Sequence, residues 1–296
     1  MGLLLRRIIT LGRAVRAGEA LLMLGFPATA GVLGIPSVHL PAVRPLVAVM
    51  LALACLSLSI YAFNTAVGFV HDRNDAKFSS NPLHLGSVQL HSLYTLTLVA
   101  AAAGFLVLAG WAIELLPAVV ILWAIWLLYS HPRGLKRIPG VASAAHVAAG
   151  ALMFLVPYLV SRSLDSRGTV LALFFGLILA SGHANHEAID EPADRTAEIG
   201  TLAVRSGRSS ALTLNLVLAG AAYALLVGGG LTRTIEPAVT FPFLAAGVVH
   251  FVAGGIVLRR TVTTEALCTY RRRYRILFAV ASLTACGLHL VGSGLL

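Results

Sequence analysis

Nine long stretches without a charged residue constrain this chain more than any other feature of its sequence. They contain between 18 and 36 residues each, and about 18 to 20 apolar residues rising ~1.5 Å apiece are enough to cross ~30 Å of hydrocarbon. Only 11% of the 296 residues are charged, against roughly 25% in a soluble domain. The stretches are 20–43, 45–71, 78–113, 115–132, 138–161, 168–186, 209–232, 237–258 and 276–296. A soluble protein is therefore excluded, and an integral, multi-pass membrane protein is predicted.

The polarity pattern inside these stretches predicts helices. Segments such as LALFFGLILA (171–180) do not alternate between polar and apolar residues, as the strands of a transmembrane β-barrel would. The stretch 78–113 begins with a polar third, so its helix is expected from about Leu93. Three widely separated cysteines suggest neither a disulfide framework nor a zinc cluster. We therefore predict an all-α, polytopic bundle of nine transmembrane helices that forms a single domain over residues 1–296.

The basic residues are distributed unequally between the two sides of such a bundle. Eighteen of the 22 Lys and Arg residues fall in alternate loops or in the N-terminal segment 1–16, which we interpret as an interfacial lead-in. By the positive-inside rule this side, with the N-terminus, faces the cytoplasm. Its loops are expected at 71–92, 130–140, 187–208 and 259–275. The net charge of +10 accompanies no nucleic-acid motif, so it indicates contact with an anionic lipid bilayer rather than nucleic acid.

Most of the acidic residues lie on this same side. Asn64 and Asp72 are eight residues apart near the end of the second helix, and Asp190 and Asp194 are four apart near the end of the sixth. These spacings place each pair on one face of a helix. A solvated acidic loop is the simpler interpretation. Carboxylates that point into one cavity repel each other unless a cation is present, however, so the arrangement also predicts a Mg²⁺ site.

Basic residues on the same side indicate that a phosphate group would bind together with the cation. The segment YSHPRGLKR (129–137) includes Lys136, and Mg²⁺ is usually held by one or two carboxylates together with phosphate oxygens. His186 stands four residues before Asp190, so it is either a donor to the phosphate or a polar residue at the cavity mouth. In a chain otherwise surrounded by lipid, an isoprenyl diphosphate fits as the substrate.

These residues resemble the UbiA superfamily of intramembrane prenyltransferases. The segment DEPADRTAEIGTLAVRSG (190–207) is similar to the second aspartate-rich motif of that superfamily, with Asp190, Asp194 and Arg195 in the expected places. YSHPRGLKR resembles its Tyr-Ser-x-Pro segment with a lysine that contacts diphosphate, here Lys136. The resemblance covers almost the whole chain and implies nine transmembrane helices with aspartate-rich motifs after the second and the sixth.

The resemblance implies an activity and a set of site residues. The activity is Mg²⁺-dependent transfer of an isoprenyl group from a prenyl diphosphate to an aromatic or lipid-like acceptor, in a cell membrane of bacterial or archaeal type. The acids Asp190, Asp194 and Asp72 with Asn64 form the implied catalytic set. Its metal ligands would be Asn64, Asp72, Asp75, Asp190 and Asp194, and its diphosphate contacts Lys136, Arg73, Arg195, Tyr129 and His186.

The first motif departs from the superfamily pattern. NTAVGFVHD (64–72) keeps Asn64 and Asp72 but has Thr65 and Gly68 at the two other acidic positions. A terpene cyclase, in which the ionised chain closes on itself, and a non-catalytic protein with the same fold therefore stay as alternatives. In the second motif, Pro192 disfavours helical backbone at the residue before it, so the sixth helix is expected to end near Asp190.

Overall fold

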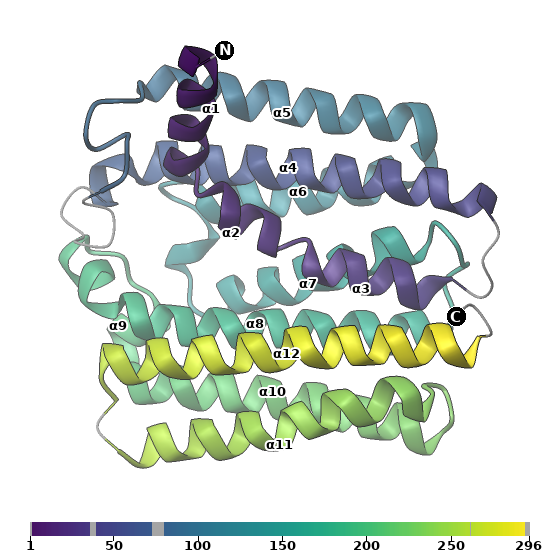
Figure 1. Ribbon diagram of the computed structural model, residues 1–296. Helices are drawn as coiled ribbons and strands as arrows, with labels where there is room; N and C mark the ends of the chain where they lie inside the picture. The colour runs from purple at the N-terminus through teal and green to yellow at the C-terminus, as the bar shows by residue number, and fades with distance from the viewer. Residues whose placement is uncertain (1, 36–39, 73–79, 261, 294–296) are drawn as a thin grey trace. The chain divides into compact units, whose positions relative to one another are not determined.

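The computed structural model describes residues 2–35, 40–72, 80–260 and 262–293 (Figure 1). The regular structure in these ranges is helical, without a strand. The helices are α1 (Gly2–Ala14), α2 (Ala17–Leu22), α3 (Gly25–Gly34), α4 (Leu40–Asp72), α5 (Leu90–Trp111), η2 (Ile113–Leu115), α6 (Leu116–Ser130), η3 (Leu135–Arg137), α7 (Val141–Tyr158), α8 (Ser166–Thr196), α9 (Leu202–Ser206), α10 (Arg208–Leu231), α11 (Pro237–Arg259) and α12 (Thr264–Gly292).

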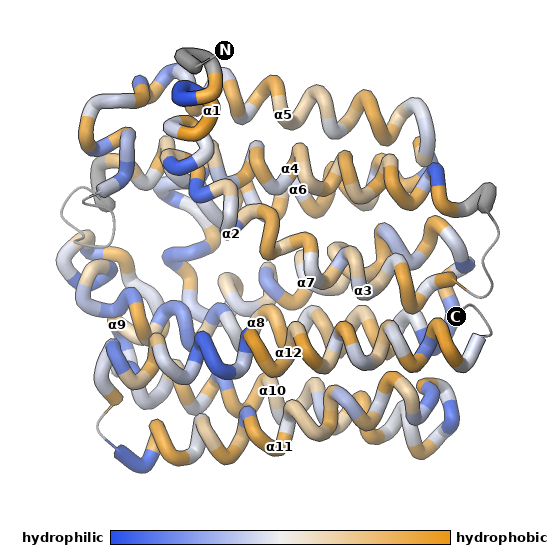
Figure 2. Tube along the Cα trace, in the orientation of Figure 1, coloured by the Kyte–Doolittle hydropathy of each residue, from blue (hydrophilic) through white to orange (hydrophobic). Residues whose placement is uncertain are grey.

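Nine segments of the described chain are long and apolar enough to cross a membrane. They correspond to α2 with α3, to η2 with α6, and to α4, α5, α7, α8, α10, α11 and α12. The long helices are hydrophobic along most of their length, and hydrophilic residues gather toward their ends (Figure 2). The predicted all-α, multi-pass membrane protein is thereby confirmed.

The chain forms two compact units, each of which is described by itself. Unit 1 comprises Met1–Gly25 and Val43–Leu135, and unit 2 comprises Phe26–Ala42 and Lys136–Leu296. The first span therefore belongs to both units, because α2 lies in unit 1 and nearly all of α3 lies in unit 2.

Unit 1 is built around α4, α5 and α6. The hydroxyl of Ser59 on α4 donates to the carbonyl of Thr97 on α5 at 2.8 Å and accepts from the indole of Trp123 on α6 at 3.2 Å. One buried hydroxyl thus connects three helices, as expected for a polar side chain that must be satisfied inside a membrane. Gly104 lets α5 approach α4, because a Cβ there would lie 3.0 Å from the carbonyl oxygen of Ala52.

Residues shortly before α5 contact the end of α1 in unit 1. The side chain of Asn81 donates to the carbonyl of Ala14 at the end of α1 at 3.0 Å. The same side chain accepts from the backbone N–H of Leu83 at 2.9 Å, and Leu83 is buried beside Ala14. The polar stretch after residue 78 therefore contains an ordered cap on α1, and α5 begins at Leu90, close to the expected Leu93.

Unit 2 is organised around α8, which packs against α7, α9, α10 and α12. Its core is aromatic: Phe154 stacks on Phe175 with ring centroids 5.0 Å apart, and Phe174 meets Phe243 edge-on at 5.2 Å. Each of these rings is fully buried. Because such pairs have preferred geometries and stabilise beyond simple burial, they fix how the helices of this unit pack.

Two glycines bring α7 and α8 into backbone contact. A Cβ added at Gly150 would lie 2.8 Å from the Cα of Gly176, and a Cβ at Gly176 would run into the carbonyl oxygen of Val147. Neither neighbour is the movable end of a side chain, so the two helices would have to separate. Small residues serve this purpose in membrane helix pairs generally.

Replacing Gly176 by Ala is therefore expected to destabilise unit 2 by about 1–3 kcal/mol, the usual result of overpacking. Gly255→Ala in α11 is the matched control, because a Cβ there meets nothing within 4 Å. It should be neutral or slightly stabilising, since Ala is the better helix former. Unfolding of the two variants in detergent micelles measures the difference, and equal stabilities would contradict the close approach.

A cluster of ionic groups lies at the end of unit 2 where α8 begins. Arg167, buried apart from 8% of its side chain, donates to the carboxylate of Glu236 at 2.9 and 3.0 Å and to the carbonyl of Leu33 at 2.7 Å. The ring of His289 donates from Nε2 to the carbonyl of Ile35 at 3.1 Å. Burial disfavours the charge of Glu236, but the ring of His289, 3.7 Å away, and the hydrogen bonds from Arg167 lower the pKa of that carboxyl to about 2. These side chains satisfy carbonyls at the end of α3 that have no partner within the helix.

Two helices extend beyond their predicted bounds. The predicted end of the sixth helix near Asp190 is wrong, because α8 continues through Pro192 to Thr196. The ninth helix begins at Thr264, so the loop expected over 259–275 is largely helical. At the start of α12, exposed arginines lie on one side of the helix while Tyr270 and Tyr274 are buried on the other. In α8 the extension buries Asp194 and leaves Arg195 exposed, with Pro192 accommodated in the last two turns.

Candidate active site

The polar residues near the end of α8 form one stripe along the helix. His183, Glu187, Asp190 and Asp194 recur at intervals of four, three and four residues, which places their side chains on one face. Three of them are buried, and Asp190 is partly exposed. The stripe therefore keeps three ionisable side chains in the packed interior of unit 2 and reaches the surface at Asp190.

Lys136 meets this stripe from η3. Its ammonium lies 2.9 Å from Oδ1 of Asp194, and the carboxylate is only 5% exposed. The guanidinium of Arg137 donates to the carbonyl of Glu198 at 3.3 Å, so two neighbouring residues attach the loop to the end of α8. The structure thus joins a base and an acid 58 residues apart in the chain.

Asp190 is paired within α8 itself. The ring of His186 lies one turn earlier, with Nδ1 3.0 Å from Oδ2 of Asp190. Both side chains are partly exposed, so Asp190 and His186 stand where the stripe reaches the surface of unit 2.

Arg195 is directed away from the stripe. Its guanidinium lies 2.6 Å from Oε1 of Glu191, and it donates to the carbonyl of Val204 at 3.5 Å. Glu191 also lies 3.3 Å from the guanidinium of Arg208. Arg195 therefore connects α8 with α9, and Glu191 connects α8 with the start of α10.

Two buried residues of the stripe do not appear among the site residues inferred from the sequence. Glu187 accepts the backbone N–H of Leu202 at 3.1 Å, at the first turn of α9, and its Oε1 lies 3.0 Å from Nε2 of His183. The ring of His183 stacks on that of His146 from α7, with centroids 3.8 Å apart. The four-residue spacing of His183 and Glu187 was the available signal, but their contacts depend on how α9 and α7 fold back.

The remaining predicted residues belong to unit 1. Asn64 is half-buried on α4, and Gly68 and Asp72 follow at four-residue intervals on the same face. Asp72 is the last residue of α4, and its side chain lies outside the described atoms, as do Arg73 and Asp75 altogether. Tyr129, near the end of α6, meets Trp126 edge-on with centroids 5.9 Å apart.

The chemistry of the acids in unit 2 fits a hard divalent cation. Oδ2 of Asp194 is buried, and within the described residues it has no hydrogen-bond partner. A buried carboxylate oxygen without a partner is costly, and a cation would satisfy it. In the described part of the chain, no three His, Cys, Asp or Glu side chains form a metal cage. The oxygen donors therefore suit an ion such as Mg²⁺, which takes few protein ligands and shares its remaining positions with phosphate or water.

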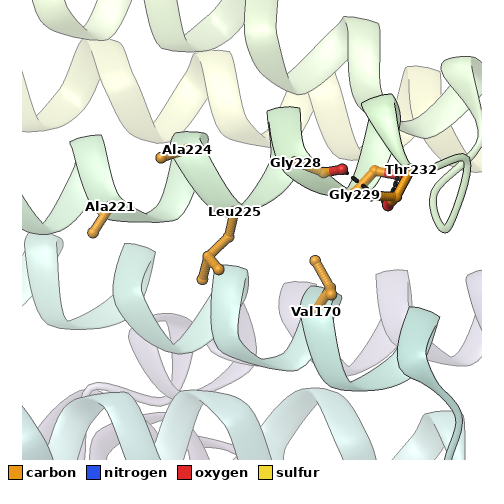
Figure 3. A pocket seen from close by; sticks show the side chains of 7 residues that line it. All are labelled: Val170, Ala221, Ala224, Leu225, Gly228, Gly229 and Thr232. Carbon is orange, nitrogen blue, oxygen red and sulfur yellow. Dashed lines mark hydrogen bonds between the residues drawn. The ribbon is translucent and has the colours of Figure 1, made fainter.

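A shallow apolar cavity of about 660 Å³ lies elsewhere in unit 2, between α8 and α10 (Figure 3). Val170, Leu225 and Gly228 are among its lining residues. Val170 precedes Asp194 by 24 residues on the same helix, roughly 36 Å at ~1.5 Å per residue. The cavity is therefore at the other end of α8 from the stripe and has no part in binding charged groups there.

The fold and this arrangement define a class of protein. It is a multi-pass helical membrane protein whose acidic and basic side chains gather at the end of a membrane-spanning helix, without a soluble domain in the described chain to carry them.

Comparisons with known proteins identify the family. The model of the UbiA prenyltransferase family matches residues 24–288, and the chain belongs to that family. A search of the curated proteins finds no match to the sequence.

Several solved structures share the fold at low sequence identity. A UbiA homolog from Archaeoglobus fulgidus, bound to GPP and Mg²⁺, has a TM-score of 0.73 and 15% identity over 94% of this chain and 99% of that one. A structure described as digeranylgeranylglyceryl phosphate synthase has a TM-score of 0.74 and 12% identity over 97% and 99%. The apo UbiA homolog from Aeropyrum pernix K1 has a TM-score of 0.69 and 17% identity over 93% and 98%. Identities this low establish the fold, and the chemistry must be argued from the residues of this chain.

Proposed function

We propose that this protein is an integral membrane prenyltransferase that moves an isoprenyl group from a prenyl diphosphate to an aromatic or lipid-like acceptor in a Mg²⁺-dependent reaction. The observation that carries the proposal is the position of Asp190 and Asp194 on one face of α8, with the ammonium of Lys136 2.9 Å from Asp194. Paired acids beside a base are the groups that a metal-bound diphosphate requires.

The Archaeoglobus homolog supports this substrate class, since it has been solved with GPP and with DMAPP, each together with Mg²⁺. In the present chain, Asp190 and Asp194 would hold Mg²⁺ from unit 2. Asn64, Asp72 and Asp75 are the proposed ligands from the first motif. When bound, the metal would neutralise charge on the diphosphate oxygens.

The side chains of the protein have distinct proposed tasks. The leaving diphosphate takes the electron pair of the breaking C–O bond, and Lys136 stabilises the charge that accumulates on it. His186 is a second donor at the rim of the stripe, and Arg73 and Tyr129 are proposed to complete the diphosphate contacts. An electron-rich atom of the acceptor then captures the allylic cation and loses a proton.

Arg195 is assigned a different task from that of the other bases. It was predicted to contact diphosphate, but its ion pair with Glu191 and its bond to Val204 favour a role in holding α9 against α8. The excess of basic residues on the side of the acidic motifs supports a cytoplasmic location of the site and of the N-terminus.

Purified protein in lipid nanodiscs tests the proposal. With Mg²⁺, it should release diphosphate from a prenyl diphosphate and attach the prenyl group to an added acceptor, whereas EDTA should abolish both reactions. Substrates of increasing length, beginning with GPP and DMAPP, define the chain specificity. Cyclised products without an acceptor would instead identify a terpene cyclase, and an absence of diphosphate release with every substrate would reject catalysis.

A further inference from the structure

Lys136 and Asp194 contact each other, although the proposed function has them bind different partners. Asp194 is a proposed ligand of Mg²⁺, and Lys136 is a proposed ligand of the diphosphate. In this structure Nζ of Lys136 lies 2.9 Å from Oδ1 of Asp194. Oδ2 of the same carboxylate is buried and has no hydrogen-bond partner among the described residues. The ammonium therefore holds one oxygen of a carboxylate whose other oxygen remains unsatisfied.

A cation is needed at this position whether or not a metal is bound. The carboxylate of Asp194 is 5% exposed, and an ionised carboxylate is strongly disfavoured in such a place unless a positive group lies against it. Glu187 and Asp190 place two further acidic side chains on the same stripe, and like charges nearby disfavour the ionised carboxylate further. Lys136 supplies the compensating charge from the loop.

We propose that Lys136 occupies the cation position of Asp194 in the metal-free protein and turns to the diphosphate when Mg²⁺ and substrate bind. This inference rests on the proposed function, since it takes Asp194 as a metal ligand and a diphosphate as the second partner. Lys136 then serves two states of one site: it stabilises the acid before the metal arrives and the leaving group afterwards.

The two side chains are built for such an exchange. The side chain of Lys136 is 33% exposed, whereas that of Asp194 is only 5% exposed, so the partner that can move is the one at the surface. A lysine carries its charge at the end of four flexible methylene groups, and the ammonium can move while the loop stays in place. Arg137 keeps the loop attached, because its guanidinium donates to the carbonyl of Glu198 beyond the end of α8.

The exchange has a thermodynamic consequence. Without diphosphate, Lys136 competes with Mg²⁺ for Asp194 and weakens metal binding. With diphosphate present, Lys136 has a better partner and the competition disappears. Lys136 therefore makes the binding of metal and diphosphate cooperative, and linkage requires that each ligand strengthen the other by the same factor.

Metal binding can be measured without turnover. Binding of Mg²⁺ by calorimetry, and of Mn²⁺ by electron paramagnetic resonance, should be followed in nanodiscs with and without inorganic diphosphate. Lys136→Met should bind Mg²⁺ about tenfold more tightly than the wild type when diphosphate is absent, within the usual range of coupling between sites. It should also lose most of the enhancement that diphosphate produces in the wild type.

Arg133→Met is the matched control. It removes an equal charge from the same loop, and Arg133 is exposed, so a general electrostatic effect would tighten metal binding equally in both variants. Lys136→Gln serves as a second replacement and should behave as Lys136→Met does. In an Asp194→Asn background, Lys136→Met should no longer change the affinity for Mg²⁺, because the carboxylate that Lys136 contacts has lost its charge.

The outcomes separate this inference from the proposed function. If Lys136→Met and Lys136→Gln bind Mg²⁺ no more tightly than Arg133→Met does, Lys136 is not a substitute cation, even when the wild type releases diphosphate normally. If the wild type binds Mg²⁺ but never releases diphosphate from a prenyl diphosphate, the proposed function fails, while the binding comparison still decides the role of Lys136.

Discussion

Asp194→Asn is expected to lower the rate of diphosphate release roughly a thousandfold, or about 4 kcal/mol of transition-state stabilisation. The substitution keeps the size of the side chain and removes its charge. The lost charge is the one that the structure places against Lys136 at 2.9 Å, where low exposure makes it most effective. Asp190→Asn should have an effect of the same order. Release of diphosphate from GPP in nanodiscs with Mg²⁺ measures both.

The appropriate control is Glu265→Gln, which neutralises an exposed acid in the first turn of α12 and should leave the rate unchanged. Folding of the Asp194→Asn variant should persist, because the ammonium of Lys136 is partly exposed and can turn to water. Retention of more than a tenth of the wild-type rate by Asp194→Asn would exclude the assigned role of this acid.

Arg167→Met is expected to cost about 3 kcal/mol of the free energy of unfolding, near the lower end of the range for breaking a buried ion pair, because Glu236 is 43% exposed. The variant loses two hydrogen bonds to Glu236 and one to the carbonyl of Leu33. Unfolding of the detergent-solubilised protein, followed by circular dichroism, gives the difference.

Arg162→Met provides the comparison. Its ion pair with Asp165 is 3.6 Å long and partly exposed on both sides, so the change should be at most about 1 kcal/mol. Arg167 and Asp194 are 27 residues apart on α8, roughly 40 Å. The affinity of Arg167→Met for diphosphate should therefore match that of the wild type, and equal stability of the two arginine variants would disprove the role of the buried pair.

The spans could be predicted from the sequence because burial in lipid excludes charge. The same criterion failed at the ends of α8 and α12. In α12, Tyr270 and Tyr274 face the core while Arg272 and Arg273 face outward, so the helix continues after the apolar stretch has ended. Charge counts locate the edge of the hydrocarbon, whereas backbone hydrogen bonding and the packing of one face determine where a helix ends.

In the candidate site, too, features within one helix could be predicted and contacts between helices could not. The four-residue spacing of Asp190 and Asp194 was readable because it depends on one helix alone. The resemblance of the second motif, rather than its spacing, predicted that Arg195 contacts diphosphate. In the structure Arg195 pairs with Glu191 within α8 and donates to Val204 of α9, and the second contact depends on how α9 returns to α8. Glu187 was overlooked for the same reason, since its partner Leu202 lies in another helix. Contacts between separate elements are not encoded in short-range periodicity.

The hydrogen bonds from Arg167 and His289 to carbonyls at the end of α3 have a consequence for biogenesis. Ile35 and His289 are 254 residues apart, so the hydrogen bond between them cannot form until nearly the whole chain has been synthesised. The first span enters the bilayer at the start of translation, and Arg167 can reach Leu33 only after α8 has followed it. The first helix to be inserted is therefore among the last to reach its final contacts. In nascent chains that stop before α12, the first span should be more accessible to cross-linking than it is in the finished protein.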